Sequence, residues 1–176
     1  PFIIISKLLS SAAERGRLVR LANGIYMKSA DSPYGMAMPS MIQIAEAIAE
    51  RDHVQCLPVG ETAENMFGLS EQVPMKAIFL TSGSARSINI GGRVLQFKRG
   101  VPRNFAFKDR NLAALCQAIK SIGDGNMTGE QISVIHEIMK HYKDNEEARA
   151  DIQLMPIWIR KLLTKVLKDI AKNEVD

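Results

Sequence analysis

Two groups of arginine and lysine side chains are the residues of this sequence best suited to chemistry, and that chemistry is the binding of phosphate. Residues 1–28 hold five Lys/Arg against one acid, Glu14, and residues 86–110 hold seven against Asp109. The whole chain of 176 residues has a net charge of only +4, so its positive charge is concentrated in these two zones. Cations gathered in this way favour a polyanionic partner such as a nucleic acid.

The first basic zone lies on a predicted helix and a predicted hairpin. Four apolar residues recur at helical spacing and predict a helix over residues 3–15, with Gly16 as its natural end. We expect the opposite face of this helix to present small polar and basic side chains. After it, "RLVRL" and "IYM" alternate around "ANG", which predicts a hairpin. The apolar positions of the helix are Ile5, Leu8, Leu9 and Ala12.

A helix followed at once by a basic hairpin is typical of the C-terminal half of a winged helix-turn-helix, in which the recognition helix enters the major groove and the hairpin is the wing. A complete winged helix has two further helices, so we expect a segment to precede residue 1. The alternative, a solvated surface ribbon, stays open. The predicted DNA contacts are Lys7, Ser10, Ser11, Arg15, Arg17, Arg20, Asn23 and Lys28.

The rest of the chain predicts a second unit with a small sheet flanked by helices. Ser40 and Gln43 form a capping box before a helix. "VQCLP" is a short strand, "GETAENMF" a short helix, and "KAIFLT", "RSINI" and "RVLQF" are predicted to form a meander. Thr128 with Gln131, and Pro156, begin later helices. We predict an α+β fold: a winged-helix remnant over 1–30, a linker over 31–39, and an α/β domain over 40–176.

The second basic zone supports a different interpretation. Arg86, Arg93, Lys98, Arg99 and Arg103 lie on or near the predicted strands, where several could share a solvent face. Such a face would suit an RNA- or nucleotide-handling protein, a second DNA contact or a protein-interaction surface. An ordinary solvated sheet face is the competing interpretation.

Other motifs give no catalytic, metal or cofactor site. His136 and His141 are five residues apart, whereas two zinc ligands on one helix face need four. "TSGSAR", residues 81–86, has the Gly and Ser of a phosphate cradle but lacks the Gly-Lys-Ser/Thr ending, so a tight turn is favoured. Glu61 and Glu64 share a helix face without a nucleophile beside them. We therefore expect a non-enzymatic protein.

Cysteine use and hydropathy favour the cytosol. The two cysteines, 60 positions apart in apolar segments, suit buried free thiols rather than a disulfide. No apolar run approaches the roughly 18 residues of a membrane span, and "PFIIIS" lacks the features of a signal peptide. We expect no membrane partner and no export.

Several segments together resemble the AbiE-type antitoxin family of type IV toxin-antitoxin systems. They are "SSAAERGRLVRLANGIYMKS", "AEAIAERD", "GLSEQVP", "FLTSG", "GGRVLQF" and "MPIWIRKLL", in that order along nearly the whole chain. Family members often carry Arg where this chain has Ser11 and Asn23. That departure predicts a shallower salt dependence of DNA binding.

The resemblance implies a bacterial cytoplasmic protein of abortive infection. Its N-terminal winged helix would bind inverted repeats in operator DNA and repress its own operon. Its C-terminal domain would be the antitoxin, antagonising a nucleotidyltransferase-like toxin without a stable complex. A homo-oligomer is among the expected assemblies.

Overall fold

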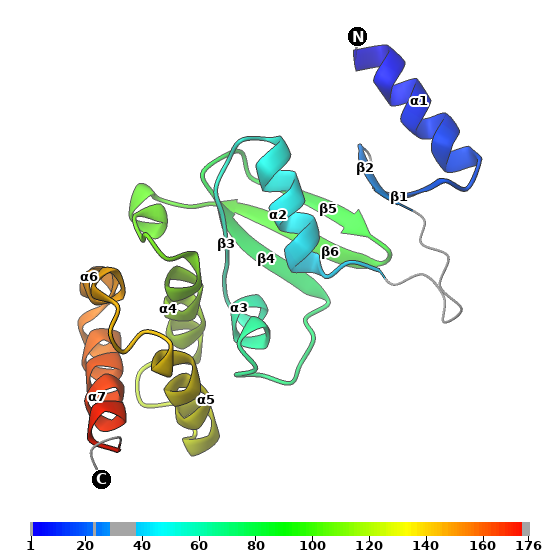
Figure 1. The fold of residues 1–176 in the computed structure, drawn as a ribbon. Coiled ribbons are helices and arrows are strands. Elements are labelled where there is room, and N and C mark those ends of the chain that lie inside the picture. The colour runs from blue at the N-terminus through cyan, green and yellow to red at the C-terminus, as the bar shows by residue number, and fades with distance from the viewer. Residues whose placement is uncertain (1, 23, 29–37, 174–176) are drawn as a thin grey trace.

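The structure is a computed structural model that describes residues 2–22, 24–28 and 38–173 (Figure 1). The chain is an α+β protein in which small sheets are flanked by helices, and this confirms the predicted fold class. The predicted contact Asn23 and most of the predicted linker, residues 31–37, lie outside the described residues. The first elements are α1 (Phe2–Glu14), β1 (Leu18–Ala22) and β2 (Ile25–Lys28).

The turn residues that punctuate the sequence shape this N-terminal part. Gly16 has φ of +72°, and its N–H donates to the Ala13 carbonyl at 3.0 Å, which ends α1. Gly24 has φ of +71° between the strands, a conformation that glycine adopts without strain. The strands β1 and β2 pair antiparallel, with Arg20 opposite Tyr26. The predicted helix and hairpin are therefore confirmed.

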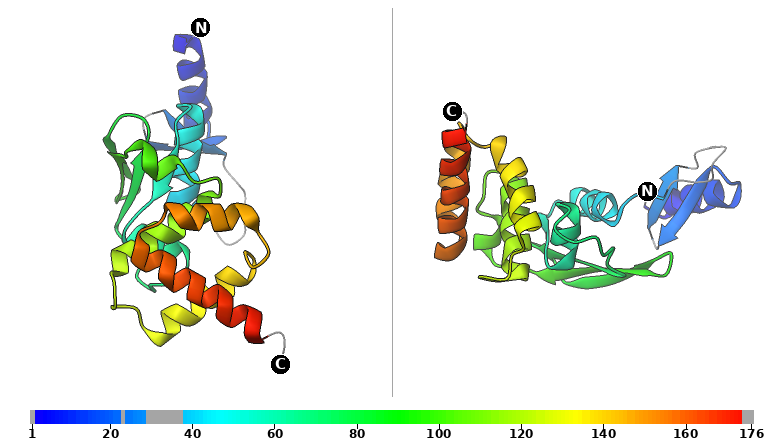
Figure 2. Two further views of the ribbon diagram at one scale, coloured as in Figure 1. Left: turned by 90° about the vertical axis from the view of Figure 1, so that its left-hand side faces the viewer. Right: turned by 90° about the horizontal axis from the view of Figure 1, so that it is seen from below.

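A four-stranded sheet forms the middle of the molecule, with the strand order β3-β4-β6-β5. Helix α2 covers one face of the sheet (Figure 2). Its buried residues Ile44 and Ile48 belong to one core cluster with Phe79, Leu95 and Phe97 of the strands. Thr62 of α3 accepts the Ile78 N–H at 2.8 Å, so α3 occupies the edge of β4 that β3 leaves unpaired. The elements are α2 (Met41–Arg51), β3 (Cys56–Pro58), α3 (Glu61–Met66), β4 (Lys76–Thr81), β5 (Arg86–Ile90) and β6 (Arg93–Arg99).

The predicted meander is wrong in one respect. The strands β5 and β6 form the expected antiparallel hairpin, but β4 pairs in parallel with β6, so β6 lies between β4 and β5. Residues 82–85 therefore cross to the far edge of the sheet instead of making a hairpin turn. A Cβ on Gly83 would lie 2.8 Å from Val54 Cγ1, and one on Gly100 would lie 2.8 Å from Phe105 Cε2. Glycine at both positions permits the close approach of chain segments at this crossing.

A second core lies among the C-terminal helices, where Leu115, Ile135 and Leu163 are fully buried. Asp151 is also buried, and its carboxylate accepts the backbone N–H groups of Lys108 and Asp109 at 3.0 and 2.8 Å. This pair of bonds ties α6 to the start of α4. The elements are a 3-10 helix η1 (Pro102–Phe105), α4 (Arg110–Ile122), α5 (Gly129–Lys140), α6 (Glu146–Leu154) and α7 (Ile157–Asn173). Neither η1 nor α6 was predicted.

The β1–β2 ribbon rests on the central unit. Its residues Leu21, Ala22 and Ile25 pack against the core under α2, and β1 lies beside the edge strand β5. Arg51 adds a hydrogen bond from its guanidinium to the Gly24 carbonyl at 3.4 Å. The molecule is elongated, with α1 and the ribbon at one end and α7 at the other (Figure 1).

Candidate nucleic-acid interface

Helix α1 is joined to the ribbon through a hydroxyl pair. Ser10 Oγ lies 3.3 Å from the Tyr26 hydroxyl, within hydrogen-bonding distance. Because Arg20 is paired with Tyr26, and Lys28 is two residues further along the same strand, all three side chains share the ribbon face that meets α1. Tyr26 was not predicted as a site residue, although its alignment opposite Arg20 follows from the hairpin register.

The position of Ser10 corrects one prediction. We expected Ser10 to face outward with Lys7, whereas it is half-buried against the ribbon. Ile5 and Leu8, expected in the core, are 53% and 64% exposed. The reason is that α1 packs on β1 with the side that carries Ser10, so the polar side is partly covered and part of the apolar side is not.

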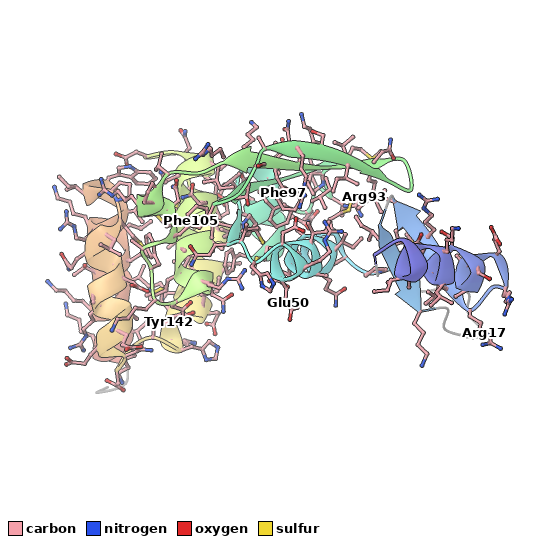
Figure 3. All side chains as sticks on the ribbon, turned by 90° about the horizontal axis from the view of Figure 1, so that it is seen from above. Arg17, Glu50, Arg93, Phe97, Phe105 and Tyr142 are labelled. Carbon is pink, nitrogen blue, oxygen red and sulfur yellow. The ribbon has the colours of Figure 1, made fainter. Side chains whose placement is uncertain are left out.

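The predicted cations of this end are displayed to solvent. Arg15 and Arg17 flank Gly16 at the junction of α1 and β1, and Figure 3 shows Arg17 at the end of the molecule far from the C-terminal helices. Arg20 is exposed on the ribbon and also interacts within the protein. We call the outer surface of α1 and the ribbon, which carries these cations, the ribbon surface. Its exposed basic residues are Lys7, Arg15, Arg17, Arg20 and Lys28, and the half-buried Ser11 lies on α1 beside them.

The second basic zone does not form one surface. Arg86 makes an ion pair with Asp52, and its guanidinium carbon lies 5.4 Å from the Phe97 ring centroid, which is cation–π geometry. Asp52 also accepts a hydrogen bond from Arg51 Nε at 2.8 Å. The Arg51 and Arg86 guanidinium groups together lower the pKa of Asp52 to about 2, because they favour its charged form.

The other members of this zone point in different directions. Arg93 donates to the Pro74 carbonyl at 3.3 Å, and Arg103 donates to the Leu154 carbonyl at 3.2 Å. Lys98 and Arg99 are exposed, but as neighbours on β6 they project to opposite faces of the sheet. The five cations therefore do not share a single solvent face, and those at positions 86, 93 and 103 serve internal contacts.

The remaining candidate motifs have structural roles. In "TSGSAR" the Gly83 N–H donates to Thr81 Oγ1 and the Ser82 N–H to the Gln55 carbonyl, both at 3.0 Å, so these two amides are not offered to a phosphate. Glu61 and Glu64 lie in the first turn of α3, where the helix dipole favours a carboxylate. Within residues 2–22, 24–28 and 38–173, no group of three or more His, Cys, Asp or Glu could hold a metal ion.

The two cysteines are buried free thiols, as predicted. Burial raises the pKa of Cys116 to about 11, and burial likewise raises the pKa of Cys56 despite its neighbour Arg110. Neither sulfur therefore has the lowered pKa of a reactive thiolate.

Comparisons with known proteins place the chain in a family without assigning an activity. None of the helices in the described ranges combines the length and hydropathy of a bilayer-spanning segment. No curated protein and no solved structure matches the sequence. One family profile matches residues 4–147, which run from α1 to the start of α6, and the chain therefore belongs to DUF6088, a family of unknown function.

Proposed function

We propose that this protein is a non-enzymatic DNA-binding regulator that represses its own operon through the ribbon surface, and that it acts as the antitoxin of an AbiE-type system in the bacterial cytoplasm. The observation that carries the DNA-binding part of the proposal is the hydroxyl contact between Ser10 and Tyr26. This contact joins α1 to a ribbon that bears exposed arginines. This arrangement resembles that of recognition helix and wing in a winged helix, which supports the proposal.

The residues of the ribbon surface have different expected roles in DNA binding. Arg15, Arg17 and Lys28 are placed to neutralise phosphates, because they are exposed on one end of the molecule. Ser10 positions α1 through Tyr26 and so does not read a base. With Ser11 half-buried and uncharged, Lys7 is the basic residue that α1 itself offers to the groove.

The antitoxin part of the proposal comes from the resemblance to the AbiE-type family. It supposes that the unit from α2 onward counters a nucleotidyltransferase-like toxin without forming a stable complex. Co-expression with a nucleotidyltransferase-like toxin encoded beside this gene tests it, and the absence of such a gene would count against this part of the proposal. Growth is expected to be rescued while a tagged copy of this chain fails to retain the toxin, whereas recovery of toxin in a stoichiometric complex would favour a protein-interaction module.

The DNA-binding part is tested with Arg15→Ala/Arg17→Ala against the DNA upstream of its own gene. Each lost phosphate contact reduces the slope of log affinity against log salt by about one, so the double variant is expected to lower that slope by about two. Fluorescence anisotropy over a salt series measures both affinity and slope. Lys120→Ala, which removes an exposed cation from α4, is the matched control and should leave both unchanged.

Two results would contradict this assignment. One is wild-type protein that shows no preference for its upstream DNA over unrelated duplex at low salt. The other is a double variant that retains the wild-type affinity and the wild-type slope. Circular dichroism of each variant separates loss of binding from loss of folding.

A further inference from the structure

The last helix, α7, has two faces of opposite character. Ile159, Leu163, Val166 and Ile170 are buried in the C-terminal core. The remainder of the helix carries five basic residues and a single acid, Asp169, so α7 alone has a net charge of +4. We call this surface the α7 basic face, and its residues are Arg160, Lys161, Lys165, Lys168 and Lys172.

These charges are not balanced within the described part of the chain. Lys161, Lys165, Lys168 and Lys172 are exposed, and none of them forms an ion pair with a residue between Phe2 and Asn173 whose side chain the structure describes. Arg160 donates one hydrogen bond to Gln153 Oε1 at 2.9 Å. Lys161 with Lys165, and Lys168 with Lys172, are like-charge pairs at i,i+4, which weaken an isolated helix. One opposite-charge pair at the same spacing, Lys165 with Asp169, offsets part of this repulsion, so charge pairing within α7 does not by itself explain the arrangement.

The α7 basic face is also hollowed. A hollow of about 420 Å³ between α6 and α7 is lined by Lys143, Arg149 and Lys168, and also by Asp144. A second, open hollow of about 690 Å³ runs along α7 past Lys161, Lys165 and Asp169. Thr164 and Lys168 line both, so the two hollows are neighbours.

We propose that the α7 basic face binds the phosphate backbone of nucleic acid, at the end of the molecule opposite the ribbon surface (Figure 1). Lys161 and Lys172 are eleven residues apart, or about 16 Å along a helix. That span covers about five phosphates of one strand of a DNA duplex, at roughly 3.4 Å of axial rise each. Lysines on phosphates carry no sequence information, so this contact is independent of sequence.

Two other partners fit this surface less well. A helix that lies on a membrane inserts its apolar face, but the apolar face of α7 is buried, and Ile157 is the exposed large apolar side chain that the helix offers among its described residues. Protein interfaces centre on aromatic and arginine anchors and are poor in lysine. The α7 basic face has the opposite composition.

The test compares two full-length triple variants that remove the same charge from different places. Lys161→Gln/Lys165→Gln/Lys168→Gln alters the α7 basic face, and Lys76→Gln/Lys120→Gln/Lys140→Gln removes three exposed lysines elsewhere. The probe is a 30-base-pair duplex of random sequence at low salt. We expect the α7 variant to weaken binding at least about tenfold and to lower the salt slope by about three, while the control changes the slope by less than one.

Two further measurements make the result decisive. Lys161→Arg/Lys165→Arg/Lys168→Arg keeps the charge and is expected to retain wild-type binding, which excludes a folding defect as the cause. The ratio of affinities for upstream and random duplex reports on the ribbon surface separately. We expect the α7 variant to keep this ratio, whereas Lys7→Ala, which removes the basic residue that α1 offers to the groove, is expected to lower it, so the two proposals fail independently.

Equal loss of duplex binding in both glutamine triples would overturn the inference, because net charge alone would then explain it. Unchanged duplex binding in the α7 variant would overturn it as well. Loss of binding to phosphatidylserine vesicles with duplex binding intact would assign the surface to a membrane instead.

Discussion

At the scale of single residues, Asp52 links three parts of the fold. It follows α2, it pairs with Arg51 and with Arg86 at the start of β5, and Arg86 in turn lies over Phe97 of β6. Arg51 also reaches the Gly24 carbonyl of the ribbon. One carboxylate therefore orients two guanidinium groups, and the cation predicted to bind a ligand at position 86 is instead part of the scaffold.

Replacing Asp52 by Asn is expected to destabilise the protein by about 1 kcal/mol at pH 7, a value suited to partly exposed ion pairs. The pKa of Asp52 falls from its ordinary 3.8 to about 2 on folding. Its contribution is therefore complete above about pH 4 and is lost as the pH falls toward 2. Urea unfolding at several pH values measures this difference between wild type and variant.

Glu50→Gln is the matched control for that experiment, since Glu50 is an exposed carboxylate at the end of the same helix (Figure 3). It should change the unfolding free energy little at any pH. An Asp52→Asn penalty that stayed constant down to pH 2 would show that charge on Asp52 is not the cause.

At the scale of elements, Gly100 marks the place where β6 leaves the sheet. Its missing side chain lets the Phe105 ring and Leu80 approach the backbone, at 2.8 and 3.2 Å from the position of a Cβ. Gly100→Ala is expected to destabilise the protein by about 1–3 kcal/mol, as overpacking does. Chemical denaturation is the measurement.

Gly129→Ala supplies the contrast, because a Cβ there meets nothing within 4 Å in the first turn of α5. This change should be neutral or stabilise by up to about 1 kcal/mol. The two alanine variants contrast a new methyl group in a crowded place with one in open space. If they had equal effects, close packing at Gly100 would not be the reason for glycine.

Local signals account for what the sequence predicted well. Both predicted capping boxes, Ser40 with Gln43 and Thr128 with Gln131, are present, because each depends on residues three apart. The strand order was not predictable in the same way. Pairing of β4 with β6 joins residues about 18 positions apart, and the Ser/Gly segment between β4 and β5 has the composition of a hairpin turn although it crosses the sheet. Helix α6 was not predicted from the sequence because it buries Asp151 and only a few apolar residues, and so lacks a clear apolar periodicity.

The candidate sites were predictable only in part. Counting Lys and Arg along the sequence identifies the cations of the ribbon surface. The inward position of Ser10, however, depends on its contact with Tyr26 and therefore on tertiary packing. The α7 basic face was missed because the net charge was counted over a long C-terminal stretch, in which the acids of neighbouring segments cancel the charge of α7. Placing residues 157–173 on a helical wheel separates the basic residues from the apolar ones and would have revealed the α7 basic face.

At the scale of the whole molecule, the ribbon also protects the sheet. The edge strand β5 lies beside β1, and Leu21, Ala22 and Ile25 cover part of the core under α2. Removing residues 1–37 is therefore expected to expose an apolar sheet edge and cause self-association. Light scattering after size exclusion would show a mass above that of one chain, and a monodisperse monomer would contradict this role.

The central position of β6 has a consequence for synthesis on the ribosome. Among the described residues β6 is the last strand to be made, yet it is the one that pairs with both β4 and β5. Until Arg99 has left the exit tunnel, those two strands have no common neighbour, and α2 lacks Leu95 and Phe97 beneath it. The nascent chain therefore completes its sheet in a late step, after the ribbon and α2 have already emerged.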